Sequence, residues 1–176
     1  ERFLPELRAF VRLRVGSALR AHESSSDIVQ SVCREILERA GEFRHPSESA
    51  FKRWLYTTAL RKVSDRWEHW TAAKRDGHEL APAAPSQGDA TRELAACYSS
   101  FTTPSGAAIL REEVARVEAA FEHLSVEQRE VITLAHVAGL SRAEIAAQMG
   151  CSEGAVRVQL HRSLARLAEL LDTSGG

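Results

Sequence analysis

Residues 140–162 restrict the fold of this chain more than any other stretch, because they have the pattern of a helix, a tight turn and a second helix. Gly150 can adopt the left-handed conformation that other residues resist, and Ser152 stands where its hydroxyl can cap the next helix. Apolar residues then recur at helical spacing and predict a buried stripe of Val156, Leu160, Leu164 and Leu167. This pattern predicts a helix-turn-helix, whose second helix enters the major groove of DNA.

The outward face of that second helix is predicted to contact DNA. Arg157 can donate two hydrogen bonds to a guanine or pair with a phosphate, and Val158 can touch a thymine methyl group. At the start of the helix, backbone amides and the helix dipole favour a phosphate. The candidate DNA contacts are Ser152, Glu153, Gly154, Arg157, Val158, His161 and Arg162. A solvated helix face is the ordinary alternative for these residues.

Amphipathic periodicity predicts further helices on both sides of a stretch that lacks it. The predicted helices cover residues 2–22, 25–42, about 50–74, 108–123 and 126–138. Between residues 77 and 107, Gly, Ala, Pro, Ser and Thr dominate, which predicts a flexible linker with one short helix near residues 90–98. We therefore expect an all-α protein made of two small helical domains joined by this linker.

Positive charge is concentrated in one predicted helix, although the net charge of the chain is −1. Residues 51–75 hold seven Lys and Arg against two acidic residues, whereas residues 108–176 hold seven Arg against ten acidic residues. Aromatic residues interleave with these cations. This combination is typical of proteins that bind single-stranded nucleic acid, because the cations pair with the phosphates and the rings stack on the bases. Trp54 shares an apolar stripe with Phe51 and Leu55, which favours core packing for it. The candidate contacts on this helix are Lys52, Arg53, Arg61, Lys62, Arg66 and Trp67.

Other patterns argue against catalysis, metal binding and membrane insertion. The three cysteines, Cys33, Cys97 and Cys151, are scattered and odd in number, which favours a reducing cytoplasm over a disulfide framework. Neither they nor the histidines have the paired spacing of a zinc site. No Ser-His-Asp order, Gly-rich phosphate loop or carboxylate pair indicates an enzyme, so we expect no cofactor and no metal. No apolar run approaches the ~20 residues of a membrane helix, so we expect no membrane partner.

Two blocks of sequence resemble parts of one bacterial family. Residues 121–132 (FEHLSVEQREVI), 139–146 (GLSRAEIA) and 154–162 (GAVRVQLHR) resemble region 4 of the extracytoplasmic-function (ECF, group IV) RNA polymerase sigma factors. Residues 27–30 (DIVQ) resemble the core-polymerase-binding helix of region 2, and residues 51–56 (FKRWLY) resemble its promoter-melting helix. The blocks follow the family's order and spacing and cover nearly the whole chain except the linker.

The resemblance implies a detachable specificity subunit that directs RNA polymerase to promoters and starts transcription. Residues 1–76 would be region 2, residues 77–107 the linker and residues 108–176 region 4. Region 4 would read the −35 element of promoter DNA, and the basic helix would read the −10 element. Arg61 stands where many members have Asn, which predicts a different −10 preference. The polymerase core would be bound through its β′ coiled coil and its β flap, with region 2 contacts at Asp27, Ile28, Gln30 and Ser31.

Three serines at residues 24–26 stand where many family members have acidic residues. Ser26 fits the N-cap of the following helix. Alternatively, a Ser/Thr kinase modifies Ser24 or Ser25, since a phosphate adds about −1.5 to −2 charges at a helix terminus that favours anions. Such a modification would switch core binding, and an anti-sigma factor is the other candidate regulator.

Two other classes of protein stay open at this stage. A helix-turn-helix repressor or response-regulator output domain would bind duplex promoter DNA without polymerase, with the N-terminal helices used for dimerisation or sensing. An interaction protein that mimics a sigma domain would not need the basic helix at residues 51–75.

Overall fold

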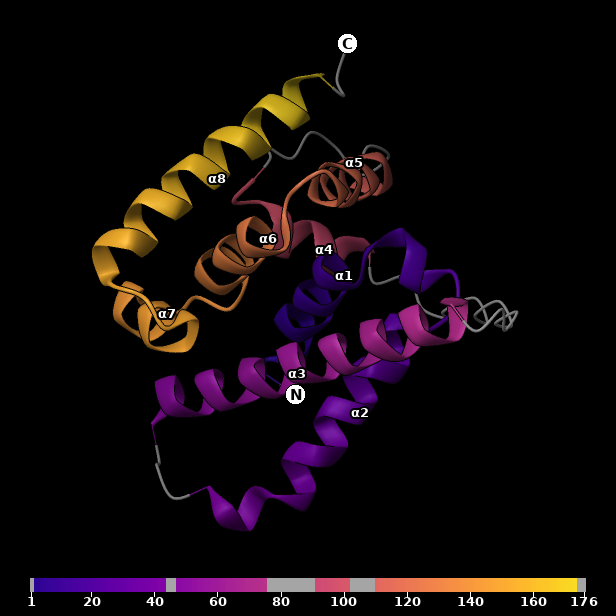
Figure 1. The fold of residues 1–176 in the computed structure, drawn as a ribbon, viewed down its shortest axis with the longest axis vertical. Coiled ribbons are helices and arrows are strands. Elements are labelled where there is room, and N and C mark those ends of the chain that lie inside the picture. The colour runs from indigo at the N-terminus through magenta and orange to yellow at the C-terminus, as the bar shows by residue number, and fades with distance from the viewer. Residues whose placement is uncertain (1, 44–46, 76–90, 102–109, 174–176) are drawn as a thin grey trace.

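The computed structural model describes residues 2–43, 47–75, 91–101 and 110–173 (Figure 1). Across these residues the chain forms α-helices joined by short turns and contains no strand, which confirms the predicted all-α fold. No helix in the described ranges is both long enough and apolar enough to cross a membrane. The elements are α1 (Leu4–Arg20), α2 (Ser25–Glu38), the 3₁₀ turn η1 (Ala40–Glu42), α3 (Glu48–Arg75), α4 (Thr91–Tyr98), α5 (Leu110–Glu122), α6 (Val126–Ile132), the π-helical turn η2 (Thr133–Val137), α7 (Arg142–Met149) and α8 (Glu153–Thr173).

The N-terminal half packs α1, α2 and α3 around a shared apolar core. Phe10 of α1 and Tyr56 of α3 are fully buried, with ring centroids 4.8 Å apart. From α2, Ile28 and Val32 enter the same core at helical spacing. The apolar stripes that predicted these helices are therefore the faces that bury them.

Helix α1 is broken at Gly16, which the apolar periodicity of residues 2–22 did not predict. Gly16 has φ 69° and ψ 170°, a conformation almost restricted to glycine, because a Cβ atom would clash with the neighbouring backbone. The helix resumes at Ser17, and the break leaves the backbone N–H of Ser17 without an intrahelical acceptor. That N–H is bonded instead to a carboxylate of the C-terminal half.

The C-terminal half is built from α5 to α8, and serine caps begin three of its helices. Ser125 and Gln128 form a capping box at the start of α6, and Ser141 and Glu144 form a second one at α7. Helix α8 crosses α6 and α7 and buries Val156 and Leu167 (Figure 1). The predicted stripe on this helix is confirmed, with Leu160 and Leu164 partly buried against the same core.

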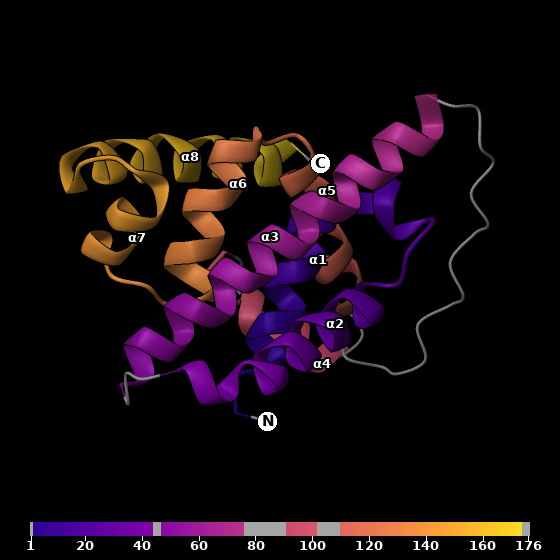
Figure 2. The same ribbon diagram turned by 60° about the horizontal axis from the view of Figure 1, so that its bottom comes forward.

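The two halves pack directly against each other, an arrangement that the sequence did not predict. Helix α1 contacts α4, α5, α6 and η2, and it lies between α3 and the C-terminal helices (Figure 2). The short helix expected within the linker is α4, which buries Leu94 and Tyr98 against α1 and α5. The rest of the predicted linker, apart from residues 99–101, lies outside the described residues. Apolar side chains from both halves therefore join in one core.

Candidate nucleic-acid interface

Local caps fix the helix-turn-helix where the sequence predicted it. The carboxylate of Glu144 accepts the backbone N–H of Ser141 at 2.8 Å, and the Ser141 hydroxyl accepts the N–H of Glu144 at 3.3 Å. Gly150 ends α7 in the left-handed conformation, at φ 65°. Ser152 then accepts the N–H of Ala155 at 3.1 Å and caps α8. These short-range bonds set the angle at which α8 leaves the turn.

The outward face of α8 is open to solvent. The side chains predicted to read DNA at this helix are all exposed, namely Ser152, Glu153, Gly154, Arg157, Val158, His161 and Arg162. Val158 is an apolar residue with 43% of its surface exposed, and it lines a shallow cleft with Gln128 and Arg162. An exposed apolar side chain among cations suits contact with a thymine methyl group beside phosphates.

The basic side chains of α3 that were predicted to contact DNA divide into two groups. Arg61 and Lys62 both pair with Glu35 of α2, and the Nζ of Lys62 lies 3.0 Å from its carboxylate. Arg66 likewise pairs with Glu23, at 3.2 Å. The carboxylates of Glu35 and Glu23 are mostly shielded from solvent. The three cations would therefore have to give up a carboxylate partner before they could pair with a phosphate.

The second group, Lys52 and Arg53, lies at the N-terminal end of α3. Lys52 pairs with Glu48 at 3.4 Å, and Arg53 lines an aromatic cleft of about 680 Å³. Phe43 and Trp54 stack in this cleft, with ring centroids 5.1 Å apart and planes 10° from parallel. Arg39 and Arg53 line the same cleft. We call the residues Arg39, Phe43, Arg53 and Trp54 the aromatic cleft. Aromatic rings beside guanidinium groups suit single-stranded nucleic acid, because bases stack on the rings and the cations pair with the backbone.

Sequence reasoning missed part of this cleft. Trp54 does pack on the core, as its stripe predicted, but its ring also faces the cleft. Arg39 and Phe43 come from the end of α2 and the turn after it, so no helical periodicity connects them with Trp54. The only available signal was their position just before the break at Pro46.

Trp67 lies farther along α3, at the boundary between the two halves. Its ring makes an edge-to-face contact with Trp70, with centroids 5.1 Å apart. It also lines a cleft of about 370 Å³ with Arg14 and with Val126 and Arg129 of the C-terminal half. Trp67 is therefore not part of the aromatic cleft, and in this arrangement the C-terminal half lies beside it.

The predicted polymerase-binding residues lie on the first two turns of α2. Asp27 and Gln30 are exposed and Ser31 is partly exposed, whereas Ile28 is fully buried in the core. Ile28 thus holds α2 in place, and its polar neighbours are the side chains that face solvent.

The N-cap of α2 is Ser24, so the prediction that Ser26 caps this helix is wrong. The Ser24 hydroxyl accepts the backbone N–H of Ser26 at 3.2 Å, because the helix begins at Ser25. Ser26 is an exposed residue of the first turn.

Comparison with known families finds matches to both halves of the chain. Residues 1–71 match the family model described as Sigma-70 region 2, and residues 115–167 match Sigma-70, region 4. Region 2 precedes region 4 along the chain, as the resemblance of the sequence blocks predicted.

Individual relatives support the same assignment. The ECF RNA polymerase sigma factor SigD of Mycobacterium tuberculosis is 33% identical over 175 residues, which cover 99% of this chain and 76% of SigD. The ECF RNA polymerase sigma factor ShbA of Streptomyces griseus is 30% identical over 146 residues, 83% of this chain and 71% of ShbA. The fold is similar to that of the sigma factor RpoE from Bartonella quintana, solved in complex with the anti-sigma factor NepR. That likeness has a TM-score of 0.65 at 21% identity and covers 97% of this chain and 92% of RpoE.

Proposed function

The chain belongs to the extracytoplasmic-function family of RNA polymerase sigma factors, and from this premise we propose how its residues divide promoter recognition between them. As a sigma factor, it directs the polymerase core to promoters and initiates transcription. The observation that carries the proposal is that an exposed helix-turn-helix and a basic, aromatic helix occur in one chain. A repressor or response-regulator output domain has no use for the second element.

The −35 element is read by α8. Arg157 and Val158 are placed to contact base edges in the major groove, and His161 and Arg162 contact bases or backbone one turn later. Ser152, Glu153 and Gly154 bring the helix N-terminus to a phosphate. This assignment is supported by the exposure of all seven side chains and by the buried Val156, which fixes the opposite face.

The −10 element is bound by α3 as a partly single-stranded segment. Lys52, Arg53, Arg61, Lys62 and Arg66 neutralise the backbone, and Trp67 offers a ring for stacking. The aromatic cleft extends this surface, because it adds two rings to the end of α3 where Lys52 and Arg53 lie. Arg61 takes the place of the Asn of many members, so its long cation gives this chain a different −10 preference.

The polymerase core is bound by α2, through Asp27, Gln30 and Ser31, with Ile28 as their structural support. The β′ coiled coil is the partner of this helix, and the β flap is the partner of region 4. An anti-sigma factor is a second partner class, since the structurally similar RpoE was solved with one.

Phosphorylation of Ser24 or Ser25 by a Ser/Thr kinase is a proposed switch for core binding. Both residues lie at the N-terminal end of α2, where the helix dipole stabilises added negative charge. Core affinity is measured for the unmodified chain, the phosphorylated chain and Ser24→Glu and Ser25→Glu variants. Equal affinity in all of them would rule the switch out.

Run-off transcription with purified core polymerase tests the proposed function. Genomic promoter fragments are transcribed with core alone, with core plus this chain, and with core plus kinase-treated chain. New start sites that require the chain are expected. If no start site depends on the chain in either form, the proposed function is wrong, and tight binding to duplex DNA without polymerase would point to a repressor.

A further inference from the structure

A small apolar cavity lies among the three helices of the N-terminal half. It has a volume of about 330 Å³, and its walls come from the start of α1, the end of α2 and the start of α3. Leu7, Ile36 and Leu55 connect it with the buried core, and every other lining residue is apolar except Cys33. Small-molecule sites measure ~300–1,000 Å³ and are lined mostly by apolar side chains. The cavity therefore has the size and the lining of a ligand site.

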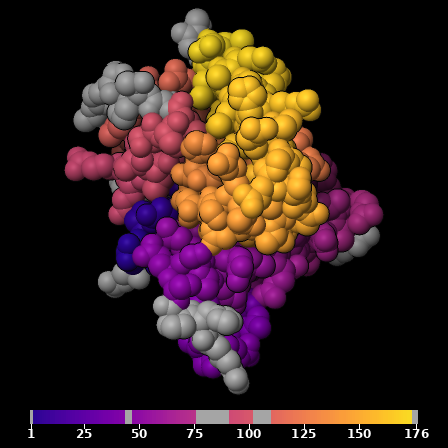
Figure 3. Space-filling view, turned by 90° about the vertical axis from the view of Figure 1, so that its left-hand side faces the viewer, coloured from indigo at the N-terminus to yellow at the C-terminus, as the bar shows by residue number. Residues whose placement is uncertain are grey.

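Part of the wall of this cavity is apolar surface in contact with water. Leu37 of α2 has 76% of its surface exposed, and Phe3 and Leu4 of the same wall are only partly buried. Figure 3 shows the start of α1, in indigo, at the surface beside the purple part of the chain. Covering apolar surface of this kind is favourable, so the cavity gains from an apolar occupant.

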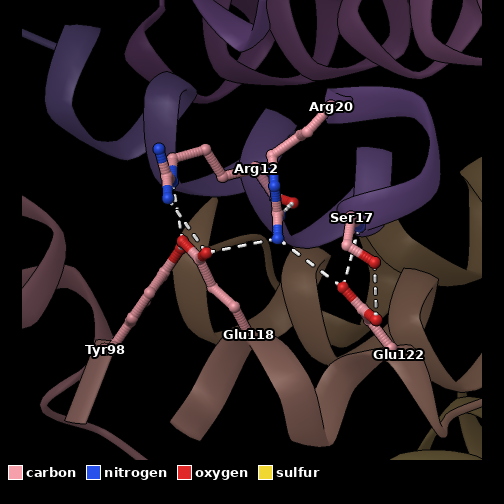
Figure 4. A network of polar contacts seen from close by, with 6 residues as sticks. All are labelled: Arg12, Ser17, Arg20, Tyr98, Glu118 and Glu122. Carbon is pink, nitrogen blue, oxygen red and sulfur yellow. Dashed lines mark hydrogen bonds and ion pairs between the residues drawn. The ribbon is translucent and has the colours of Figure 1, made fainter. Parts of the chain in front are cut away.

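Helix α1 is held on its other side and does not fill the cavity. Arg12 donates two hydrogen bonds to Glu118 of α5, at 2.6 and 2.9 Å (Figure 4). Farther along, Ser17 donates its backbone N–H to Glu122 at 2.8 Å. A shift of α1 towards α2 and α3 would break these bonds, so the cavity is a stable feature of the packing.

Positive charge lies at the wall that Phe3 forms. The guanidinium of Arg2 is 5.3 Å from the centroid of the Phe3 ring, and the Nζ atom of Lys52 is 5.4 Å from it. Within the described residues, Glu48 is the carboxylate that pairs with both cations, at 3.0 and 3.4 Å. Glu48 is 46% exposed, and such exposed pairs contribute little. Two cations that share one carboxylate leave one positive charge uncompensated, which favours an anion.

We propose that this cavity binds the anion of a medium-chain fatty acid, with the acyl chain among the apolar side chains and the carboxylate beside Arg2 and Lys52. One carboxylate matches the one uncompensated charge. A single chain fits the volume, whereas a partner helix has a diameter of ~10–12 Å and needs a longer groove. A membrane phospholipid has two chains, and the second would stay outside. This site is additional to promoter recognition and does not depend on it.

Calorimetric titration of the full chain with octanoate, decanoate and dodecanoate tests the apolar part of the site. Each methylene group that enters the cavity should tighten binding about fourfold, so decanoate should bind ~15-fold more tightly than octanoate. One ligand per chain is expected. Affinity that does not rise with the length of the acyl chain would overturn the proposal.

Comparison of decanoate with uncharged decanol tests the part played by the carboxylate. Arg2→Gln is expected to weaken decanoate binding ~2–5-fold and to leave decanol binding unchanged, because only the anion pairs with the guanidinium. Arg8→Gln is the matched control, since Arg8 is an exposed cation on α1 that pairs with Glu93 instead. Equal effects of the two variants on decanoate would remove Arg2 from the site.

The thiol of Cys33 shows whether the ligand occupies this cavity. N-ethylmaleimide labels Cys33 in a full chain whose Cys97 and Cys151 are replaced by Ala, and circular dichroism establishes that this chain is folded. Decanoate at about ten times its Kd should slow the labelling about tenfold, because only the empty fraction reacts. Decanoate that binds without protecting Cys33 would lie elsewhere, and the proposal would be wrong.

Two further arms distinguish the other possible occupants. Vesicles of phosphatidylglycerol and phosphatidylcholine should neither bind the chain nor protect Cys33, whereas protection by vesicles but not by decanoate would overturn the fatty-acid site. Protection of Cys33 in the polymerase holoenzyme, with none by any fatty acid, would show that the cavity is a protein contact. Because none of these measurements needs transcription, a failure of the proposed function would leave their outcome unchanged.

Discussion

At the scale of single residues, the side chains proposed to bind DNA have different partners on α8 and on α3. Arg157 on α8 is exposed and faces solvent, whereas Arg61, Lys62 and Arg66 on α3 are already paired with carboxylates. A cation that must first give up a carboxylate gains less from a phosphate. Arg157 should therefore show the larger effect on DNA binding when it is removed.

Arg157→Ala is expected to weaken binding to a −35 element by about 1–3 kcal/mol if the guanidinium reads a base. The measurement uses the polymerase holoenzyme and a promoter mapped by run-off transcription. Arg166→Ala is the matched control, because Arg166 lies on the same helix and pairs with Glu169 at 3.0 Å. Equal losses for the two variants would remove Arg157 from the site.

The carboxyl group of Glu144 has a shifted pKa, which makes the stability of the fold depend on pH. Desolvation would raise the pKa of its carboxyl, but hydrogen bonds from Ser49 and Ser141 outweigh it and hold the pKa below the ordinary 4.5. A lowered pKa in the folded state stabilises the fold above the unfolded value, and this contribution is lost as pH falls through the folded value.

Glu144→Gln is therefore expected to be less stable than the parent chain at pH 7, with the difference disappearing below the folded pKa. Glutamine can keep the capping box with Ser141, so the comparison isolates the charge. Urea unfolding followed by circular dichroism from pH 7 to about pH 3 measures it. A stability difference that does not change with pH would contradict the assignment.

At the scale of elements, α1 carries two functions in one helix. Its apolar face anchors the N-terminal core, and its polar residues around the Gly16 break bind α5. The break is possible because glycine alone adopts φ 69° with ψ 170° without strain. An unbroken helix would use the N–H of Ser17 internally and leave Glu122 without that bond.

Gly16→Ala is accordingly expected to destabilise the chain by about 1–3 kcal/mol, through strain at this position. Gly41→Ala is the control, since Gly41 has no positive φ and no atom within 4 Å of an added Cβ. Thermal unfolding compares the two variants. If Gly16→Ala were as stable as Gly41→Ala, α1 would not need its break.

At the scale of the whole molecule, the apolar core runs through both halves. Side chains of α1, α4, α5 and α6 belong to one cluster, so neither half can unfold without exposing the other. The three tryptophans, Trp54, Trp67 and Trp70, all lie on α3, so their fluorescence reports on the N-terminal half and on its contact with the C-terminal half. Helix content, by contrast, reports on both halves.

Tryptophan fluorescence and far-ultraviolet circular dichroism should therefore give the same unfolding midpoint for the parent chain. Replacing Glu118 and Glu122 by Gln should separate the two midpoints, because the halves then unfold more independently. Replacing the exposed Glu112 and Glu169 by Gln makes the same change in net charge and should keep the two midpoints together. Separate midpoints in the parent chain would show that the two halves are not coupled.

The sequence by itself determined the features that depend on near neighbours. The helix-turn-helix followed from Gly150 and Ser152, whose caps bond residues within a few positions along the chain. The apolar stripes followed from helical spacing in the same way. The family resemblance needed only the order of the residues, so it too was available from the sequence, at residues 27–30, 51–56, 121–132, 139–146 and 154–162.

Only the tertiary structure decided which distant side chains meet. Arg12 and Glu118 are 106 positions apart, and Ser17 and Glu122 are 105 apart, so no local pattern connects them. The aromatic cleft likewise joins residues on both sides of a turn and adds Gln148 from the other half. Helix formation depends on bonds within a few residues, whereas an ion pair depends on where the whole chain brings its charges. For that reason the sequence predicted the two proposed DNA-binding elements, but only the fold decided how the halves that carry them pack against each other.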